Sequence, residues 1–137
     1  WNIKGEPVNS DLETLLPFNP ADGVTWGDTQ DREGLRYLND SDTPYTGKLF
    51  NVYKNGVRSS ELNYKDGKLH GPWITWHGRW KSSEFNHKEN KAHGVFTMWH
   101  RNGKKQGEVI YKDDEKISAK YWNSKGEPVG SEEESEG

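Results

Sequence analysis

The sequence predicts an all-β fold, a single antiparallel meander sheet of consecutive β-hairpins, and three observations lead to this class. A unit that begins at Gly47 recurs at Gly71 and Gly94, with a weaker counterpart at Ser118, so the spacing is 24, 23 and 24 residues. Self-similarity at a fixed period of this size indicates a repeat architecture. Each unit holds two short apolar or aromatic runs separated by turn signals. The 137 residues include seven Trp but few aliphatic side chains, which suits a thin sheet better than a thick core.

The part of the chain before the repeats divides into two segments. Residues 1–8 (WNIKGEPV) are nearly identical to residues 122–129 (WNSKGEPV). We therefore expect residues 1–8 to be the end of a preceding repeat array, which would make the chain a fragment of a longer protein. Residues 9–33 predict a short helix and a loop connector. The run from Ser10 to Glu13 has the pattern of a capping box, and the Pro, Gly and Asp residues that follow are typical of a loop.

The hairpin array is expected to span residues 34–129, with units that start near residues 47, 71, 94 and 118. Before the first unit, Gly34–Leu38 has the composition of a strand, and Pro44 is expected to open the strand that leads into the first unit. In that unit the turn signals are Asn55-Gly56 and Asp66-Gly67. Asn-Gly and Asp-Gly supply the positive backbone dihedrals that two-residue hairpin turns require.

Two turns depart from the repeat pattern. In the middle unit, the first turn is His77-Gly78-Arg79-Trp80, one residue shorter than its counterpart in the first unit, so an altered turn is expected there. The third unit has Asp113-Asp114 at its second turn, without the glycine, which predicts an irregular hairpin.

Charge is distributed unevenly along the chain. Residues 1–44 carry a net charge of −6, residues 45–129 carry +7 and residues 130–137 carry −4. The last segment (GSEEESEG) is expected to be a disordered acidic tail. A basic repeat region between acidic flanks indicates an acidic partner or self-interaction. The alternative is a lysine-rich solvated surface that keeps sheet edges from pairing.

Composition excludes several classes of protein. The chain has no cysteine, which rules out disulfides and thiolate metal sites, and no apolar run long enough to span a bilayer as a helix. The sequence does not indicate a compartment. His70 and His93 share one repeat position, as do His77 and His100, but equivalent positions in a meander lie roughly 10 Å apart. Because ligand nitrogens must lie within about 2.1 Å of one ion, a structural or surface role is favoured, and no metal or cofactor is expected.

The glutamates Glu61, Glu84 and Glu108 also follow the repeat, each three residues after a Lys or Arg. Paired carboxylates can perform acid–base chemistry, but catalysis needs one site with two different environments, and a repeated ladder does not provide that. Cross-strand pairing with Lys or Arg explains the ladder more simply. The sequence therefore predicts no catalytic residue and no enzyme.

The tryptophans allow two interpretations. Trp73, Trp76, Trp99 and Trp122 recur at repeat positions, which favours packing between neighbouring hairpins. Trp73 and Trp76 are three residues apart, so a regular strand would place them on opposite faces, and at least one is expected to be exposed unless a bulge intervenes. Trp80, which lies in the shortened turn, is expected to be the most exposed.

The repeat pattern resembles the MORN-variant repeat, and within that group it is similar to bacterial proteins of the YwqK antitoxin family. The resemblance covers roughly residues 34–129, and it rests on Trp73, Trp76, Trp99, Asn102, Gly103, Lys104, Glu61, Glu84, Glu108, Tyr64, Tyr111, Gly67, Lys68, His70, Gly71, His93 and Gly94. It implies an antiparallel sheet of successive hairpins without enzymatic activity.

These observations predict a non-catalytic module that mediates protein–protein interaction, with an antitoxin or immunity protein as its most specific form. The expected partner is an acidic protein rather than nucleic acid, and a monomer is expected rather than an oligomer. The alternatives are a peripheral module that binds anionic lipid or polysaccharide through a basic aromatic face, and a structural array in a larger surface protein. Binding is expected to use one sheet face near the first turns, with the candidate residues Arg79, Trp80, Lys81, Trp99, Arg101, Lys104 and Lys105.

Overall fold

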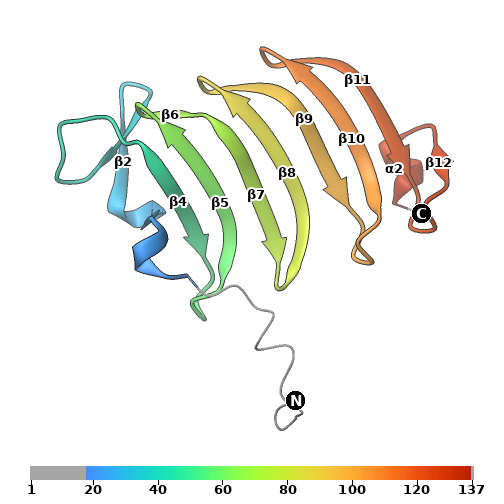
Figure 1. The fold of residues 1–137 in the computed structure, drawn as a ribbon, viewed down its shortest axis with the longest axis horizontal. Helices are drawn as coiled ribbons and strands as arrows, with labels where there is room; N and C mark the ends of the chain where they lie inside the picture. The colour runs from blue at the N-terminus through green and yellow to red at the C-terminus, as the bar shows by residue number, and fades with distance from the viewer. Residues whose placement is uncertain (1–17, 137) are drawn as a thin grey trace, which may run out of the picture.

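The computed structural model describes residues 18–136. Strands β2 and β3 form a small two-stranded sheet, and the other strands form one large, open, curved sheet (Figure 1). The sheet has ten strands in the order β1-β4-β5-β7-β8-β9-β10-β11-β12, with β6 beside β5. From β4 to β12 each strand runs antiparallel to its neighbours, and only β1 runs parallel, next to β4. The predicted all-β meander of consecutive hairpins is therefore confirmed. The predictions for residues 1–8 and for the capping box at Ser10 lie outside the described residues.

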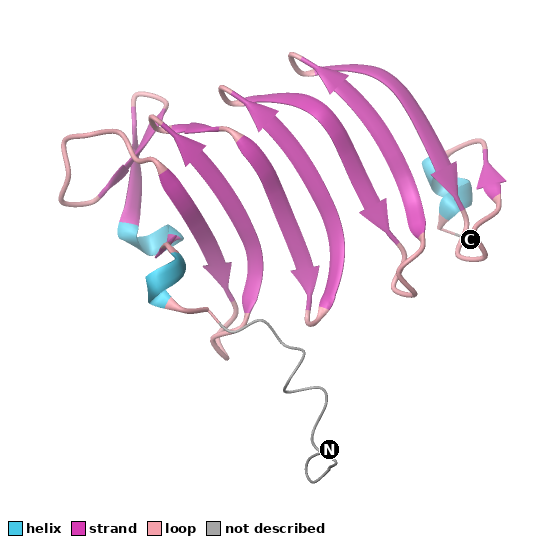
Figure 2. Cartoon of the chain, in the orientation of Figure 1, coloured by secondary structure: helices cyan, strands magenta, loops and turns pink. Residues whose placement is uncertain are grey.

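Helical segments are short and lie at the two ends of the sheet (Figure 2). They are the 3₁₀ helices η1 (Pro20–Asp22) and η2 (Trp26–Asp28) and the helix α2 (Glu132–Ser135). Within the described residues, none is long and apolar enough to cross a membrane. The strands are β1 (Val24–Thr25), β2 (Thr29–Arg32), β3 (Leu35–Leu38), β4 (Gly47–Val52), β5 (Arg58–Lys65), β6 (Lys68–Leu69), β7 (Gly71–His77), β8 (Trp80–Lys88), β9 (Lys91–Trp99), β10 (Lys105–Lys112), β11 (Glu115–Trp122) and β12 (Pro128–Val129).

Residues 18–46, which precede the first unit, contain more β-strand than the sequence predicts. The predicted strand at Gly34–Leu38 exists as β3, but its partner β2 falls in a stretch predicted to be loop. Pro44 does not open the strand leading into the first unit, because it forms only an isolated bridge with Tyr37 and β4 begins at Gly47. Proline has no backbone N–H to donate to a ladder, and this is the physical reason for the later start.

In the first and third units, the first turn is built differently from the two-residue turn that the sequence suggested. In the first unit, Gly56 N–H donates to the Tyr53 carbonyl and Tyr53 N–H donates to the Val57 carbonyl, both within 2.9 Å. Gly56 has a φ of 86°, whereas Asn55 is not among the residues with positive φ. This is a three-residue loop in which only the glycine is left-handed. The turn at Gly103 has the same hydrogen bonds, with a φ of 89°.

The middle unit has the altered first turn that its shorter sequence predicts. β7 ends at His77 and β8 begins at Trp80, so only Gly78 and Arg79 lie between them, and Gly78 has a φ of 64°. Glycine with positive φ at the first central position is typical of a type II′ hairpin turn.

Valine at Gly56 or Gly103 should lower the free energy of unfolding by roughly 1–3 kcal/mol, because a β-branched residue resists positive φ. No atom lies within 4 Å of a Cβ built at either glycine, so the loss would come from backbone strain alone. Arg79→Val should cost less than about 1 kcal/mol, since Arg79 is not a positive-φ residue. Denaturant unfolding of the three variants checks the assignment, and equal losses at all three positions would contradict it.

The second turns all keep positive φ at both central residues. The values are 51° and 82° for Asp66-Gly67, 49° and 70° for Glu89-Asn90, and 49° and 69° for Asp113-Asp114. The turn at Asp113-Asp114 therefore has the same backbone geometry as the other second turns. The side chain of Asp114 compensates, because its Oδ1 accepts a 2.7 Å hydrogen bond from Ala92 N–H. The irregularity that the sequence predicts for this hairpin lies in its strands, because the pairing of β10 with β11 shifts register between Ile110 and Tyr111.

The core lies at the start of the array. Leu49, Leu62 and Tyr64 form a buried cluster on one face of β4 and β5, against which Val24 and Trp73 pack. On the other face Phe50 is buried. Burial declines toward β11, where most side chains are exposed. The elements before β4 therefore cover the first hairpin, while the later hairpins form a single layer.

The C-terminal segment was expected to be a disordered acidic tail, and this is wrong for residues 131–136. Ser131 caps α2, since its hydroxyl accepts a 3.2 Å hydrogen bond from Glu134 N–H. Ser135 is fully buried and its hydroxyl lies 3.2 Å from Gln106 Nε2 on β10. Three glutamates in the first helical turn also favour a helix start, because negative charge there interacts well with the helix dipole.

Candidate partner-binding cleft

Successive side chains along a strand point to opposite faces of a sheet, and the register between strands therefore shows which side chains share a face. We call the side that carries Glu61, Glu84 and Glu108 the charged face. The other side, which we call the uncharged face, holds two main rows across the strands: Leu49, Leu62, Trp73, Phe85, Phe96, Val109 and Ala119, and Asn51, Ser60, Thr75, Ser83, Met98, Gly107 and Tyr121. Neither row contains an ionisable carboxylate, Lys or Arg, so the two faces suit different ligands.

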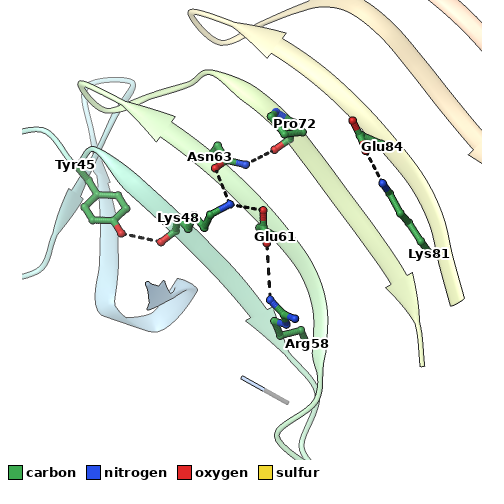
Figure 3. Close-up of polar contacts among 8 residues, drawn as sticks. All are labelled: Tyr45, Lys48, Arg58, Glu61, Asn63, Pro72, Lys81 and Glu84. Atoms are coloured by element: carbon green, nitrogen blue, oxygen red, sulfur yellow. Dashed lines mark hydrogen bonds and ion pairs between the residues drawn. The ribbon is translucent and has the colours of Figure 1, made fainter. Parts of the chain in front are cut away.

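The glutamate ladder on the charged face is neutralised mainly within each strand. Lys81 Nζ lies 2.6 Å from Glu84 Oε1 (Figure 3). In the third unit, Lys105 Nζ lies 2.6 Å from Glu108 Oε2. Residues three apart in a regular strand point to opposite faces. A register shift between each pair, such as that between Lys105 and Gly107, inserts an extra residue and brings both side chains to one face.

The first unit repeats this arrangement and adds a cross-strand partner. Arg58 Nη1 lies 3.9 Å from Glu61, and Lys48 Nζ on β4 lies 2.7 Å from the same carboxylate (Figure 3). Among the residues that the structure describes, the predicted cross-strand pairing with a ladder glutamate is seen in this unit alone. In the other two units the prediction is wrong, because the bulge makes the pair local.

A cleft of about 610 Å³ opens at the edge of the sheet where β8 begins and β9 ends, and it is lined by Arg79, Trp80, Lys81, Trp99, Arg101 and Gly103. Five of the seven candidate residues therefore come together around one hollow. The two others lie outside it. Lys104 Nζ donates to the Lys125 carbonyl at 3.2 Å, toward the next turn, and Lys105 is held by Glu108.

The cations in the cleft differ in how firmly they are held. Lys81 is fixed twice, because its Nζ bonds to Glu84 and lies 4.9 Å from the centroid of the Trp99 ring. Arg101 is exposed, and it has no hydrogen-bond or ion-pair partner among the residues that the structure describes. Arg101 can therefore reorient toward a ligand at little cost in free energy, whereas the ammonium group of Lys81 is held in one position before a ligand binds.

The aromatic side chains of the cleft are less exposed than predicted. Trp80 is half-buried, and its ring lies against that of His77 in a tilted arrangement, with 5.2 Å between centroids. Trp99 is also half-buried beneath Lys81. The prediction that Trp80 would be the most exposed tryptophan is wrong, because the short turn folds its ring against His77 instead of projecting it into solvent.

The cleft lies where a series of bonds between neighbouring turns is interrupted. Tyr53 Oη reaches the Trp76 carbonyl at 3.4 Å, and His100 Nε2 lies 2.8 Å from the Trp122 carbonyl. His77 occupies the equivalent position in the middle unit, yet it forms no such bond within the described part of the chain. The turn that lacks this bond is the one that carries Arg79 of the cleft.

Trp73 and Trp76 lie on opposite faces, as their spacing predicts, but neither is exposed. Trp76 is buried, and the Arg58 guanidinium lies 5.2 Å from its ring centroid. Trp73 packs on the cluster around Leu62. Among residues 18–136, the most exposed tryptophan is Trp26, at 48%. The sequence pattern did not single it out because it falls in a predicted loop.

The histidines do not converge on one point. Within residues 18–136, no group of three or more His, Asp or Glu side chains could hold a metal ion. His93 Nδ1 lies 3.8 Å from Asp113. His87, on the uncharged face, has a pKa lowered by burial, so it is neutral around pH 7.

Comparisons of the chain with protein-family models, with curated proteins and with solved structures found no match. The resemblance to MORN-variant repeats remains a sequence-based prediction.

Proposed function

We propose that the protein is a non-catalytic repeat module that binds an acidic segment of a protein partner in the cleft around Trp99. The observation that supports this most directly is the convergence of two tryptophans and three cationic side chains on one hollow of about 610 Å³. Tryptophan and arginine are the residues most enriched at interface hot spots. An antitoxin or immunity protein is the most specific form of this function that the sequence resemblance suggests.

The electrostatics of the cleft favour a carboxylate-bearing partner. Arg101 offers a planar guanidinium that can hold a carboxylate through two hydrogen bonds. The half-buried rings of Trp80 and Trp99 lie beside the cations of the cleft and offer aromatic surface to the same acidic segment. The net charge of +7 over residues 45–129 would also steer an acidic partner toward the array.

A structural role for the glutamate ladder supports a binding module over an enzyme. Glu61, Glu84 and Glu108 each have a Lys or Arg partner within 3.9 Å. A general acid or base is usually found where neighbouring groups push two carboxylates to different pKa values. Glu84 and Glu108 occupy matching half-buried environments with one lysine each, and Glu61 is buried between two cations. All three carboxylates therefore serve to orient neighbouring cations.

The double variant Arg79→Glu/Arg101→Glu should weaken partner binding at least tenfold, which corresponds to about 1.4 kcal/mol. Both side chains line the cleft and both are exposed. Reversing their charge would therefore make the cleft repel an acidic partner while removing little buried side-chain surface. The measurement is affinity capture from the native extract, followed by titration of the captured protein against each variant.

The matched control is Lys112→Glu/Lys120→Glu, which changes the net charge equally at exposed positions of β10 and β11 outside the cleft. It should retain the partner. Equal weakening by both double variants would contradict the proposal, since it would show a diffuse basic surface. Binding that falls steeply with salt and does not discriminate among partners would instead support the alternative, an anionic lipid or polysaccharide surface.

A further inference from the structure

A second hollow lies on the uncharged face, at the start of the array. It has a volume of about 340 Å³ and is lined by Trp26, Asn51, Leu62, Tyr64, Leu69 and Trp73. We call it the Trp26 pocket. None of the lining residues is Asp, Glu, Lys or Arg, and the volume lies at the lower end of the range of small-molecule sites. It therefore differs in chemistry from the basic cleft, which opens at the edge between β8 and β9.

Trp26 is held in place although about half of its side chain faces solvent. It is the first residue of η2, and η2 is capped by Asp28, whose Oδ2 accepts bonds from Thr25 N–H and Thr25 Oγ1 at 3.0 and 2.9 Å. The guanidinium of Arg36 lies 4.0 Å from the Trp26 ring centroid. Two separate interactions thus fix a ring that is 48% exposed. Such a ring contributes little to the core but is preorganised to receive a ligand.

Aromatic side chains continue from the pocket across the uncharged face. Trp73 lies 5.9 Å from His87 between ring centroids, and Phe85 lies 4.8 Å from His87, 4.4 Å from Phe96 and 5.3 Å from Tyr111. All five side chains are half-buried. We call them the ring strip. Together with the Trp26 pocket, the ring strip presents aromatic surface over β7, β8, β9 and β10.

Neutral polar groups lie beside the ring strip in the next row of the register. They are Asn51, Ser60, Thr75 and Ser83, which follow one another across β4, β5, β7 and β8. Asn51 Nδ2 donates to Ser60 Oγ at 2.8 Å, which leaves the Asn51 carbonyl oxygen available in the pocket. The hydroxyls of Thr75 and Ser83 can donate as well as accept.

We propose that the Trp26 pocket and the ring strip bind a neutral sugar chain. A pyranose ring presents C–H groups on one side, and these suit the negative face of an aromatic ring. Its hydroxyls suit neutral donors and acceptors such as those of the Asn51–Ser83 row. The pocket lining and both rows hold no Asp, Glu, Lys or Arg, and the Arg36 guanidinium nearby is already engaged with the Trp26 ring and with Tyr64. Little in the site would therefore compensate the desolvation of a charged ligand. This inference does not rest on the proposed function, because the two sites share no lining residue.

The test is titration with neutral hexasaccharides of glucose in two linkages, of mannose and of N-acetylglucosamine, followed by tryptophan fluorescence and calorimetry. At least one should bind the wild-type protein saturably, and Trp26→Ala should weaken that binding at least tenfold. Trp26→Phe should recover part of the affinity, because it restores a ring at the same position. Trp80→Ala, in the cleft, is the matched control and should bind as the wild type does.

Three results would each overturn the inference. One is the absence of saturable binding for every hexasaccharide. Another is equal binding by the wild type and Trp26→Ala. The third is saturable binding of a neutral proline-rich peptide by the pocket with no response to any sugar, because aromatic grooves also accept such peptides. The melting curve of Trp26→Ala should overlay that of the wild type, since the ring is half exposed.

Discussion

Replacement of Phe50 by alanine should lower the free energy of unfolding by about 3–5 kcal/mol, the usual cost of truncating a buried phenylalanine. Phe50 is 1% exposed. The Phe18 ring lies 5.5 Å from it between centroids, and the Arg58 guanidinium lies 5.3 Å from its ring centroid. The substitution would therefore leave a cavity where the N-terminal segment packs on the array. Equilibrium unfolding in urea or guanidinium measures the loss.

Ile117→Ala is the control for this substitution. Ile117 lies on β11 and is 57% exposed, so its truncation should change stability by no more than about 0.5 kcal/mol. A comparable loss at both positions would show that stability is spread evenly along the array instead of being concentrated at β4 and β5.

Gly67→Val should be similarly damaging, because two costs of roughly 1–3 kcal/mol each would add, one from strain and one from overpacking. Gly67 has a φ of 82°. A Cβ at this position would lie 3.0 Å from Leu35 Cβ and 3.1 Å from Pro44 Cβ. The Gly67 N–H also donates to the Tyr45 carbonyl at 2.8 Å, and the Gly67 carbonyl accepts from the Arg36 N–H.

The matched variant is Gly34→Val. Gly34 has a nearly equal φ of 85°, but no atom lies within 4 Å of a Cβ built there, so only the strain term applies. The difference between the two variants in denaturant unfolding isolates the packing term. If Gly34→Val were as destabilising as Gly67→Val, contact between the second turn and the Leu35–Pro44 segment would not contribute to stability.

The repeat made the array predictable, because period and turn residues are local properties of the sequence. Of the two strands that were missed, β2 forms a local hairpin with β3 through the turn at Glu33 and Gly34, whereas β1 owes its structure to a tertiary contact. β1 pairs with β4 across more than 20 residues, with Val24 opposite Leu49. Ser135 is buried because its segment docks on β10, and this tertiary contact leaves no pattern in the local sequence. The acidic composition of that segment therefore predicted disorder.

The cleft could be predicted in part for a similar reason. Repeat alignment placed Arg79, Trp80 and Lys81 near the first turns, and they do line the cleft with Trp99 and Arg101. It could not tell that Lys105 would be held by Glu108, since that depends on the bulge. Gly103 lines the cleft without a side chain, so no chemical pattern could have identified it.

The interrupted bond at His77 also has a mechanical consequence. β8 and β9 are joined covalently at one end by the turn at Glu89 and Asn90, whereas at the other end the cleft separates their neighbouring turns. Stability in a linear array is a sum of unit terms and nearest-neighbour coupling terms. The coupling between the first turns of the middle and third units lacks the kind of hydrogen bond that Tyr53 and His100 form between the other neighbouring turns. Twisting or pulling the array would concentrate deformation there, and a ligand bridging the two turns would stiffen the sheet along its length.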